Sequence, residues 1–136
     1  MSEESKIGSN GTGRKKHLFI VDDEQMLVDL ADAILSHEGY CVETFLDPSM
    51  ALGRLRAANP KPDLLITDCV MYGMDGLALI QEARATNSAI RCLLLSGTVD
   101  QDYLDNHPVK PDRFLRKPYR AEALVTVVRE LLNSAE

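Results

Sequence analysis

Three acidic side chains, one hydroxyl and one ammonium group each follow a short apolar stretch of this sequence of 136 residues. They belong to Asp22, Asp23, Asp68, Ser96 and Lys117. If the apolar stretches are strands of one parallel sheet, their carboxyl ends share an edge, where ligands bind in such sheets. We therefore expect these five side chains to converge on one site.

Three neighbouring carboxylates favour a bound cation, because like charges a few ångströms apart raise one another's pKa values. Oxygen ligands favour Mg²⁺, which typically uses one or two carboxylates together with water and phosphate oxygens. A carboxylate beside such an ion can attack phosphorus and form an acyl phosphate. Lys117 and the cation would neutralise the phosphoryl oxygens. The pattern thus predicts a Mg²⁺-dependent site that accepts a phosphoryl group.

Short apolar stretches and segments of helical periodicity alternate along the chain and must position these residues. The alternation predicts a parallel sheet of five strands with helices on both faces, an α/β doubly wound fold, because parallel neighbours need crossover connections. The segment 99–106 has a weak helical pattern, so the form of the fourth helix is left open. We expect strands at 17–21, 40–45, 64–67, 90–95 and 113–116, and helices over 24–38, from 47 to about 58, after 76 and after 118.

Composition bounds the class of protein. The formal charge of −6 opposes attraction to nucleic acid, so we expect no direct nucleic-acid partner. No apolar run is long enough for a membrane span, and the three cysteines are widely separated, as in a protein of the reducing cytoplasm. We expect a disordered leader over residues 1–15 and a single domain over 16–134.

Five short motifs lie at the ends of the apolar stretches or in the loops that follow them: Val21-Asp22-Asp23-Glu24, Leu65-Ile66-Thr67-Asp68, Met74-Asp75-Gly76, Leu95-Ser96-Gly97 and Phe114-Leu115-Arg116-Lys117-Pro118. In order and spacing, they resemble the receiver domain of response regulators in two-component signalling. The resemblance covers about residues 16 to 134 and implies a CheY-like, flavodoxin-like sheet with strand order 2-1-3-4-5. One departure is Tyr72 after Met71, where receivers commonly carry Met-Pro.

The resemblance implies a role for each residue of the phosphoryl and metal site. Asp68 is similar to the phosphoacceptor, which is also one of the metal ligands. Asp23 resembles a direct Mg²⁺ ligand, Asp22 a ligand through water, and the carbonyl of Val70 a further ligand. Lys117 is similar to the lysine that holds the phosphoryl group.

The resemblance also implies a signalling switch rather than an enzyme. Ser96 resembles the switch hydroxyl that moves toward the phosphate, and Phe114 the aromatic residue that moves with it. The expected phosphodonor is a histidine kinase or a histidine phosphotransfer protein, and the expected reader is a downstream protein target or an output domain. The sequence leaves open whether the domain stands alone or belongs to a hybrid kinase or a longer regulator.

Two other functions compete with this interpretation. A phosphorylation-independent receiver-like interaction module would share the fold, but the complete set of acids, Ser96 and Lys117 argues against it. A magnesium-dependent phosphatase would need a second acid soon after its nucleophile, whereas Cys69 and Val70 follow Asp68. For Cys69 itself, we expect a packed thiol rather than a redox sensor.

Overall fold

A parallel sheet of five strands forms the centre of the computed structural model, which describes residues 15–133. The order β2-β1-β3-β4-β5 confirms the doubly wound α/β fold. The leader predicted over residues 1–15 lies outside the described residues apart from its last one. The strands are β1 (His17–Val21), β2 (Cys41–Phe45), β3 (Leu64–Asp68), β4 (Arg91–Ser96) and β5 (Arg113–Arg116).

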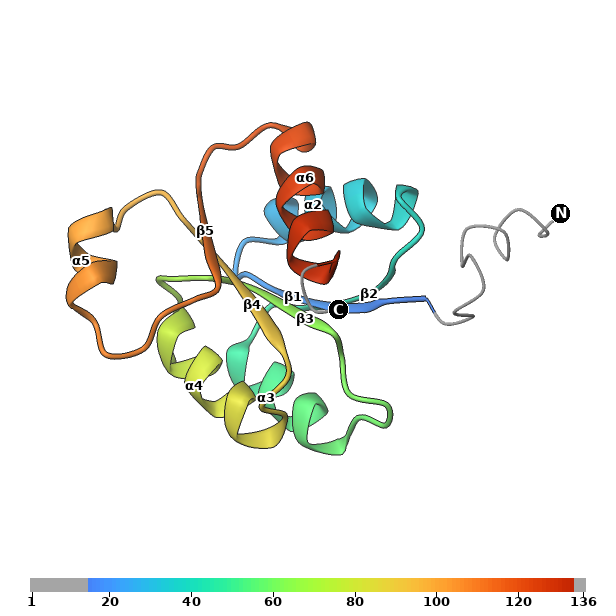
Figure 1. Ribbon diagram of the computed structural model, residues 1–136, viewed down its shortest axis with the longest axis horizontal. Coiled ribbons are helices and arrows are strands. Elements are labelled where there is room, and N and C mark those ends of the chain that lie inside the picture. The colour runs from blue at the N-terminus through green and yellow to red at the C-terminus, as the bar shows by residue number, and fades with distance from the viewer. Residues whose placement is uncertain (1–14, 134–136) are drawn as a thin grey trace, which may run out of the picture.

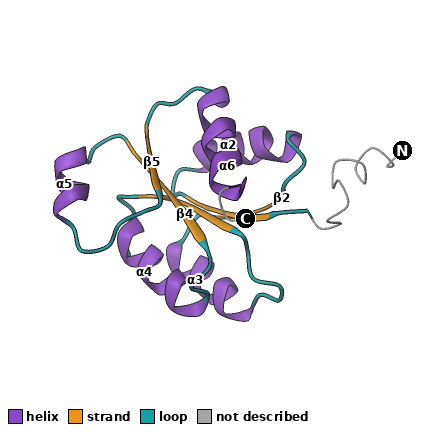
Figure 2. Ribbon diagram, viewed as in Figure 1, coloured by secondary structure: helices purple, strands orange, loops and turns teal. Residues whose placement is uncertain are grey.

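The helices cover the two faces of the sheet (Figures 1 and 2). One face carries α2 (Gln25–His37) and α6 (Ala121–Asn133). The opposite face carries α3 (Pro48–Ala57) and α4 (Gly76–Thr86). This division follows from right-handed crossovers between parallel strands.

Helices cover both faces of the central strands, which explains why the sequences of these strands are continuous apolar runs. In β1, Phe19 and Val21 join the core beneath α3 and α4, whereas Leu18 and Ile20 join the core beneath α2 and α6. Every residue of β3 is buried. Strands covered on both faces need apolar residues at successive positions, so the alternation typical of a half-exposed strand is absent.

The fourth helix after the leader region, α5 (Gln101–Asn106), is short and stands away from the sheet in Figure 1. Its start is capped by the carboxylate of Asp100, which accepts a hydrogen bond of 3.0 Å from the Tyr103 N–H. Only Leu104 of this helix is buried. A helix with one buried side chain has no apolar stripe, which accounts for the weak pattern in the sequence.

Aspartate side chains cap the starts of α3 and α4, the two helices on the opposite face of the sheet from α2 and α6. Asp47 accepts a hydrogen bond of 2.9 Å from the Ser49 N–H, with Pro48 as the first helical residue. Asp75 accepts one of 2.8 Å from the Ala78 N–H at the start of α4. The loops after β2 and β3 lie at the carboxyl edge of the parallel sheet, and each ends at one of these capped helix starts.

Candidate functional site

Strand register brings the predicted site residues to one edge of the sheet. Val21 pairs with Thr67, so Asp22 and Asp68, the residues that follow each, become neighbours. Ser96 pairs with Arg116, and the next residue, Lys117, donates its N–H to the Ser96 carbonyl at 3.0 Å. The five residues selected from the sequence therefore all lie at the carboxyl ends of β1, β3, β4 and β5.

Asp22 is the most deeply enclosed carboxylate of the site, with 2% of its surface exposed. Its Oδ1 accepts a hydrogen bond of 3.0 Å from the Glu24 N–H. Its main-chain N–H donates to the Phe45 carbonyl at 3.1 Å, which anchors the end of β1 to β2. The neighbouring Asp23 is exposed. One of the paired acids is thus held inside the site, and the other reaches it from the solvent side.

Lys117 links two of the three carboxylates. Its Nζ lies 2.8 Å from Oδ2 of Asp22 and 3.1 Å from Oδ1 of Asp68. Asp68 itself is 9% exposed at the end of β3. The ammonium group supplies one positive charge against three acidic groups, so the site keeps an excess of negative charge when all three are ionised.

The electrostatics of the site raise the pKa of both Asp68 and Lys117, which disfavours the charged form of the acid and favours that of the lysine. Burial and the nearby charge of Asp22 raise the pKa of Asp68, and Lys117 opposes this only in part. Burial alone would lower the pKa of Lys117, but its contacts with Asp22 and Asp68 outweigh burial and raise it. The lysine therefore stays charged, whereas the negative charge of ionised Asp68 is only partly balanced by Lys117.

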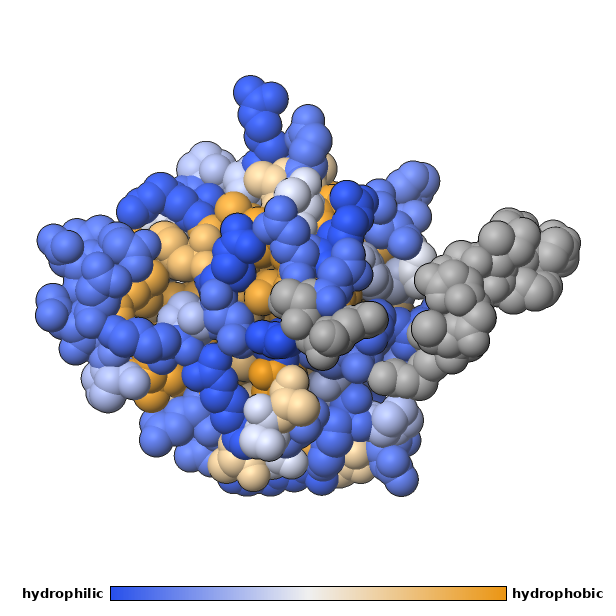
Figure 3. All heavy atoms as spheres, viewed as in Figure 1, coloured by the Kyte–Doolittle hydropathy of each residue, from blue (hydrophilic) through white to orange (hydrophobic). Residues whose placement is uncertain are grey.

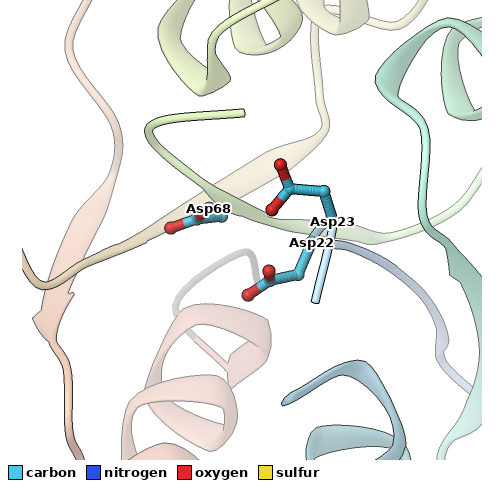
Figure 4. Close-up of side chains that lie close together, drawn as sticks. All are labelled: Asp22, Asp23 and Asp68. Carbon is cyan, nitrogen blue, oxygen red and sulfur yellow. The ribbon is translucent and has the colours of Figure 1, made fainter. Parts of the chain in front are cut away.

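The acidic cluster fits a divalent cation. Asp22, Asp23 and Asp68 can each offer one oxygen within 4.8 Å of the others. Figure 4 shows Asp22 and Asp23 at the end of β1 and Asp68 beside them at the end of β3. Hard oxygen donors with excess negative charge suit Mg²⁺. Val70 lies in the loop that follows Asp68, and a ligand role for its carbonyl stays a prediction.

Ser96 is the last residue of β4, and Phe114 lies within β5, where it pairs with Leu94. Ser96 is 1% exposed, and its Oγ accepts hydrogen bonds of 3.1 Å from the N–H groups of Thr98 and Val99. Phe114 is half-buried against the core beneath α4, and the Arg116 guanidinium lies 5.8 Å from its ring centre. The serine hydroxyl thus holds the loop that leads into α5.

Sequence reasoning missed two contacts of the site, and only one of them has a signal in residue type. The N–H of Tyr72 donates to Oδ2 of Asp23 at 3.3 Å. Gly76 lies so close to the Asp68 carbonyl that a Cβ at this position would collide with it. A glycine in the Met-Asp-Gly motif could have been suspected, whereas a main-chain donor is common to every residue except proline.

Cys69 is packed, as expected. It is 1% exposed, and burial, with Asp75 and Asp68 nearby, raises the pKa of its thiol to about 11. A reactive cysteine needs exposure and a lowered pKa, so this thiol is unsuited to redox sensing.

Residues 18–129 match the protein family described as Response regulator receiver domain, and the chain belongs to that family. The solved receiver domain protein from Methanospirillum hungatei superposes with a TM-score of 0.82 at 23% identity, covering 90% of this chain and 97% of the other. The response regulator receiver protein from Sinorhizobium medicae gives 0.81 at 25% identity, covering 90% and 98%. Receiver domains are signalling modules, so family and fold agree with the sequence prediction.

Curated relatives include whole regulators and a kinase. The chain is 28% identical to the probable transcriptional regulatory protein TcrX of Mycobacterium tuberculosis, covering 89% of this chain and 51% of the relative. It is also 28% identical to the sensor kinase CckA of Brucella abortus, covering 88% and 13%. The chain thus spans about half or less of the length of these relatives. Within residues 15–133, no helix is long and apolar enough to cross a membrane.

Proposed function

We propose that this receiver domain accepts a phosphoryl group on Asp68 in a Mg²⁺-dependent reaction and thereby switches a protein-interaction surface. The observation that carries the proposal is the contact of Lys117 Nζ with both Asp22 and Asp68, beside a third carboxylate within 4.8 Å. This arrangement supplies a nucleophile, a fixed cation and oxygen ligands for a metal ion. The domain acts as a switch in the cytoplasm rather than as a metabolic enzyme.

The donor is the phosphohistidine of a histidine kinase or histidine phosphotransfer protein. An oxygen of the Asp68 carboxylate forms a bond to phosphorus while the bond from phosphorus to the imidazole nitrogen breaks. The nitrogen keeps the electron pair, and the ring leaves as neutral imidazole with the proton on its other nitrogen. Lys117 would lie within reach of the new phosphoryl oxygens. Asp22, Asp23, Asp68 and the Val70 carbonyl would hold Mg²⁺, whose charge would help to neutralise these oxygens.

Exposed apolar side chains in the loops and first helical turns that follow β1, β2 and β3 support a protein donor. Asp68 is only 9% exposed, so a donor side chain reaches it only if the donor protein covers the surrounding loops. Clustered apolar side chains on a surface are typical of interaction sites. We call the following set the apolar rim, because its members lie in or next to the loops that follow β1, β2 and β3: Met26, Leu46, Met50, Val70 and Tyr72.

The surface that responds to phosphorylation lies near Ser96, Phe114 and α5. A move of the Ser96 hydroxyl toward a phosphoryl group on Asp68 would release the N–H groups at the start of the loop to α5. A hollow of about 330 Å³ separates α5 from β5, with Leu104 and Phe114 among its walls. Figure 3 shows apolar atoms between α5 and the rest of the domain. A downstream protein or an output domain would read this surface.

The direct test is the intact mass of the protein after incubation with acetyl phosphate and Mg²⁺. We expect a gain of one phosphoryl group, lost in Asp68→Asn and in the presence of a chelator. Asp29→Asn, an exposed acid on α2, is the matched control and should behave like the wild type. No gain in the wild type would favour the alternative, a phosphorylation-independent receiver-like interaction module.

A further inference from the structure

The carboxylate of Asp23 is held differently from the other two acids of the site. Asp22 and Asp68 both contact Lys117, and Asp22 also accepts the Glu24 N–H. Asp23 has neither partner. Among the described residues, its hydrogen-bond donor is the main-chain N–H of Tyr72, 3.3 Å from Oδ2.

The loop that carries this N–H is fixed at several points, independently of the Tyr72 side chain. The Cys69 N–H donates to the Leu95 carbonyl at 2.9 Å, and the Gly76 N–H donates to the Cys69 carbonyl at 2.7 Å. Met71 is buried and anchors the chain immediately before Tyr72. The Tyr72 side chain, in contrast, is 93% exposed. The loop therefore presents the N–H at a defined place, whatever side chain position 72 carries.

We propose that the main-chain N–H of Tyr72 is a positioning group that holds the Asp23 carboxylate ready for the cation and so sets the Mg²⁺ affinity of the site. The inference rests on the proposed function, because it assumes that the three acids bind Mg²⁺. One oxygen of Asp23 is engaged by the N–H, which leaves the other for the metal. An exposed side chain that is already oriented loses less rotational freedom when it becomes a ligand.

The magnitude follows from the usual effect of groups that orient metal ligands. Loss of such a group typically weakens metal binding about 10- to 100-fold. The hydrogen bond from the Tyr72 N–H to Asp23 is exposed to water and comparatively long, so we expect its loss to weaken Mg²⁺ binding at the low end of this range, about tenfold. A proline at position 72 is the natural test, because proline removes the N–H.

The matched pair of variants is Tyr72→Pro and Tyr72→Ala, with Mg²⁺ affinity of the unphosphorylated protein measured by isothermal titration calorimetry. Both lose the aromatic side chain, but only the first loses the donor. We expect Tyr72→Ala to bind Mg²⁺ within about twofold of the wild type and Tyr72→Pro about tenfold more weakly. Equal affinity of the two variants would overturn the proposal.

Proline could also weaken binding by distorting the loop, so the effect must be traced to Asp23. In an Asp23→Asn background, Tyr72→Pro should cause little further loss of Mg²⁺ affinity, because the carboxylate it orients is gone. An undiminished loss in that background would refute the role of Asp23. Thermal unfolding of each variant identifies any that fails to fold. If Tyr72→Pro fails to fold, Tyr72→Ala still tests the proposal, because it keeps the N–H: a tenfold loss of Mg²⁺ affinity in Tyr72→Ala would assign the effect to the side chain and overturn the proposal.

The experiments distinguish failure of the proposed function from failure of the role of Tyr72. A wild-type protein that binds no Mg²⁺ and takes up no phosphoryl group would overturn the proposed function and this inference together. A wild-type protein that does both, with Tyr72→Pro unchanged in Mg²⁺ affinity, would overturn only the role of Tyr72.

Discussion

Lys117 and Asp22 stand 95 positions apart in the chain, yet their side chains form an ion pair of 2.8 Å between Nζ and Oδ2. The pair crosses the carboxyl edge of the sheet from β5 to β1, and Asp68 lies between these strands on β3. Asp22 is 2% exposed, so without the lysine a buried carboxylate would face a second acid. The same contact that stabilises the folded domain thus prepares a cation beside the proposed phosphoacceptor.

Replacing Lys117 should therefore destabilise the protein as well as abolish stable phosphorylation. We expect Lys117→Ala to lower the free energy of unfolding by about 2–3 kcal/mol, because the buried Asp22 loses its charged partner. Urea unfolding measures the change. The double variant Asp22→Asn, Lys117→Ala should recover part of the loss, and an undiminished loss would show that the ion pair is not its cause.

Removing the charge of Asp68 should have the opposite effect on stability. The pKa of Asp68 is raised, chiefly by burial, so its contribution to stability is fully present below the pKa of the unfolded chain and is lost as the pH rises through the folded pKa. At pH 7 we expect Asp68→Asn to raise the free energy of unfolding by about 1 kcal/mol, a gain typical of relieving strain in a functional site. The gain should shrink at acidic pH in urea titrations, while Asp29→Asn stays near the wild type at both pH values.

Gly76 should tolerate no side chain. A Cβ there would collide with the Asp68 carbonyl and lie 3.0 Å from the Cys69 Cα, both main-chain atoms that cannot rotate away. We expect Gly76→Ala to cost about 2–3 kcal/mol of stability and to lower the rate of phosphorylation by acetyl phosphate, since the end of β3 must shift.

Gly53 in α3 is the matched control for that substitution. No atom lies within 4 Å of a Cβ built at Gly53, so Gly53→Ala should stabilise the protein by about 0.5–1 kcal/mol through helix propensity. Equal thermal shifts for the two alanine variants would contradict the steric account of Gly76.

The apolar rim should distinguish a protein phosphodonor from a small one. Met26 and Met50 are 82% and 65% exposed and lie in the first turns of α2 and α3, which follow β1 and β2. We expect the double variant Met26→Ser, Met50→Ser to lose at least tenfold in transfer rate from a histidine phosphotransfer protein that phosphorylates the wild type, since buried apolar anchors dominate interface energies. Phosphorylation by acetyl phosphate should be unchanged, and an equal fall with both donors would point to damage to the site itself.

The phosphorylated state should be long-lived. Val70, two residues after Asp68, is exposed beside the site and has no polar group to orient an attacking water. We expect a half-life well beyond seconds in a phosphate-release assay, and Val70→Asn to shorten it severalfold. Thr98, whose Oγ1 lies 3.5 Å from the Ser96 Oγ, supplies an alternative polar group, so we expect Thr98→Val to lengthen the half-life.

The alternation of strands and helices was predictable because each element carries its signal locally. Continuous apolar runs mark β1, β3 and β4, and the Asp47-Pro48 pair marks the start of α3. The boundaries differ by one or two residues, for example in β4, which runs to Ser96 rather than Leu95. The form of the short α5 cannot be predicted from the sequence pattern, because Leu104 is its only buried residue and a single buried position defines no periodicity.

By itself, the sequence determined the types of group at the strand ends and, through their order, the family and the fold. Only the tertiary structure decided which of them touch: Lys117 contacts Asp22 and Asp68 but not Asp23, whose partner is the Tyr72 N–H. The reason is that side-chain chemistry is a property of each residue, whereas the distance between strand ends depends on strand register. The register is set by the pairing of all five strands in the sheet. A main-chain donor leaves no trace in residue type, so its role at Asp23 emerged only once the loop was folded against the end of β1.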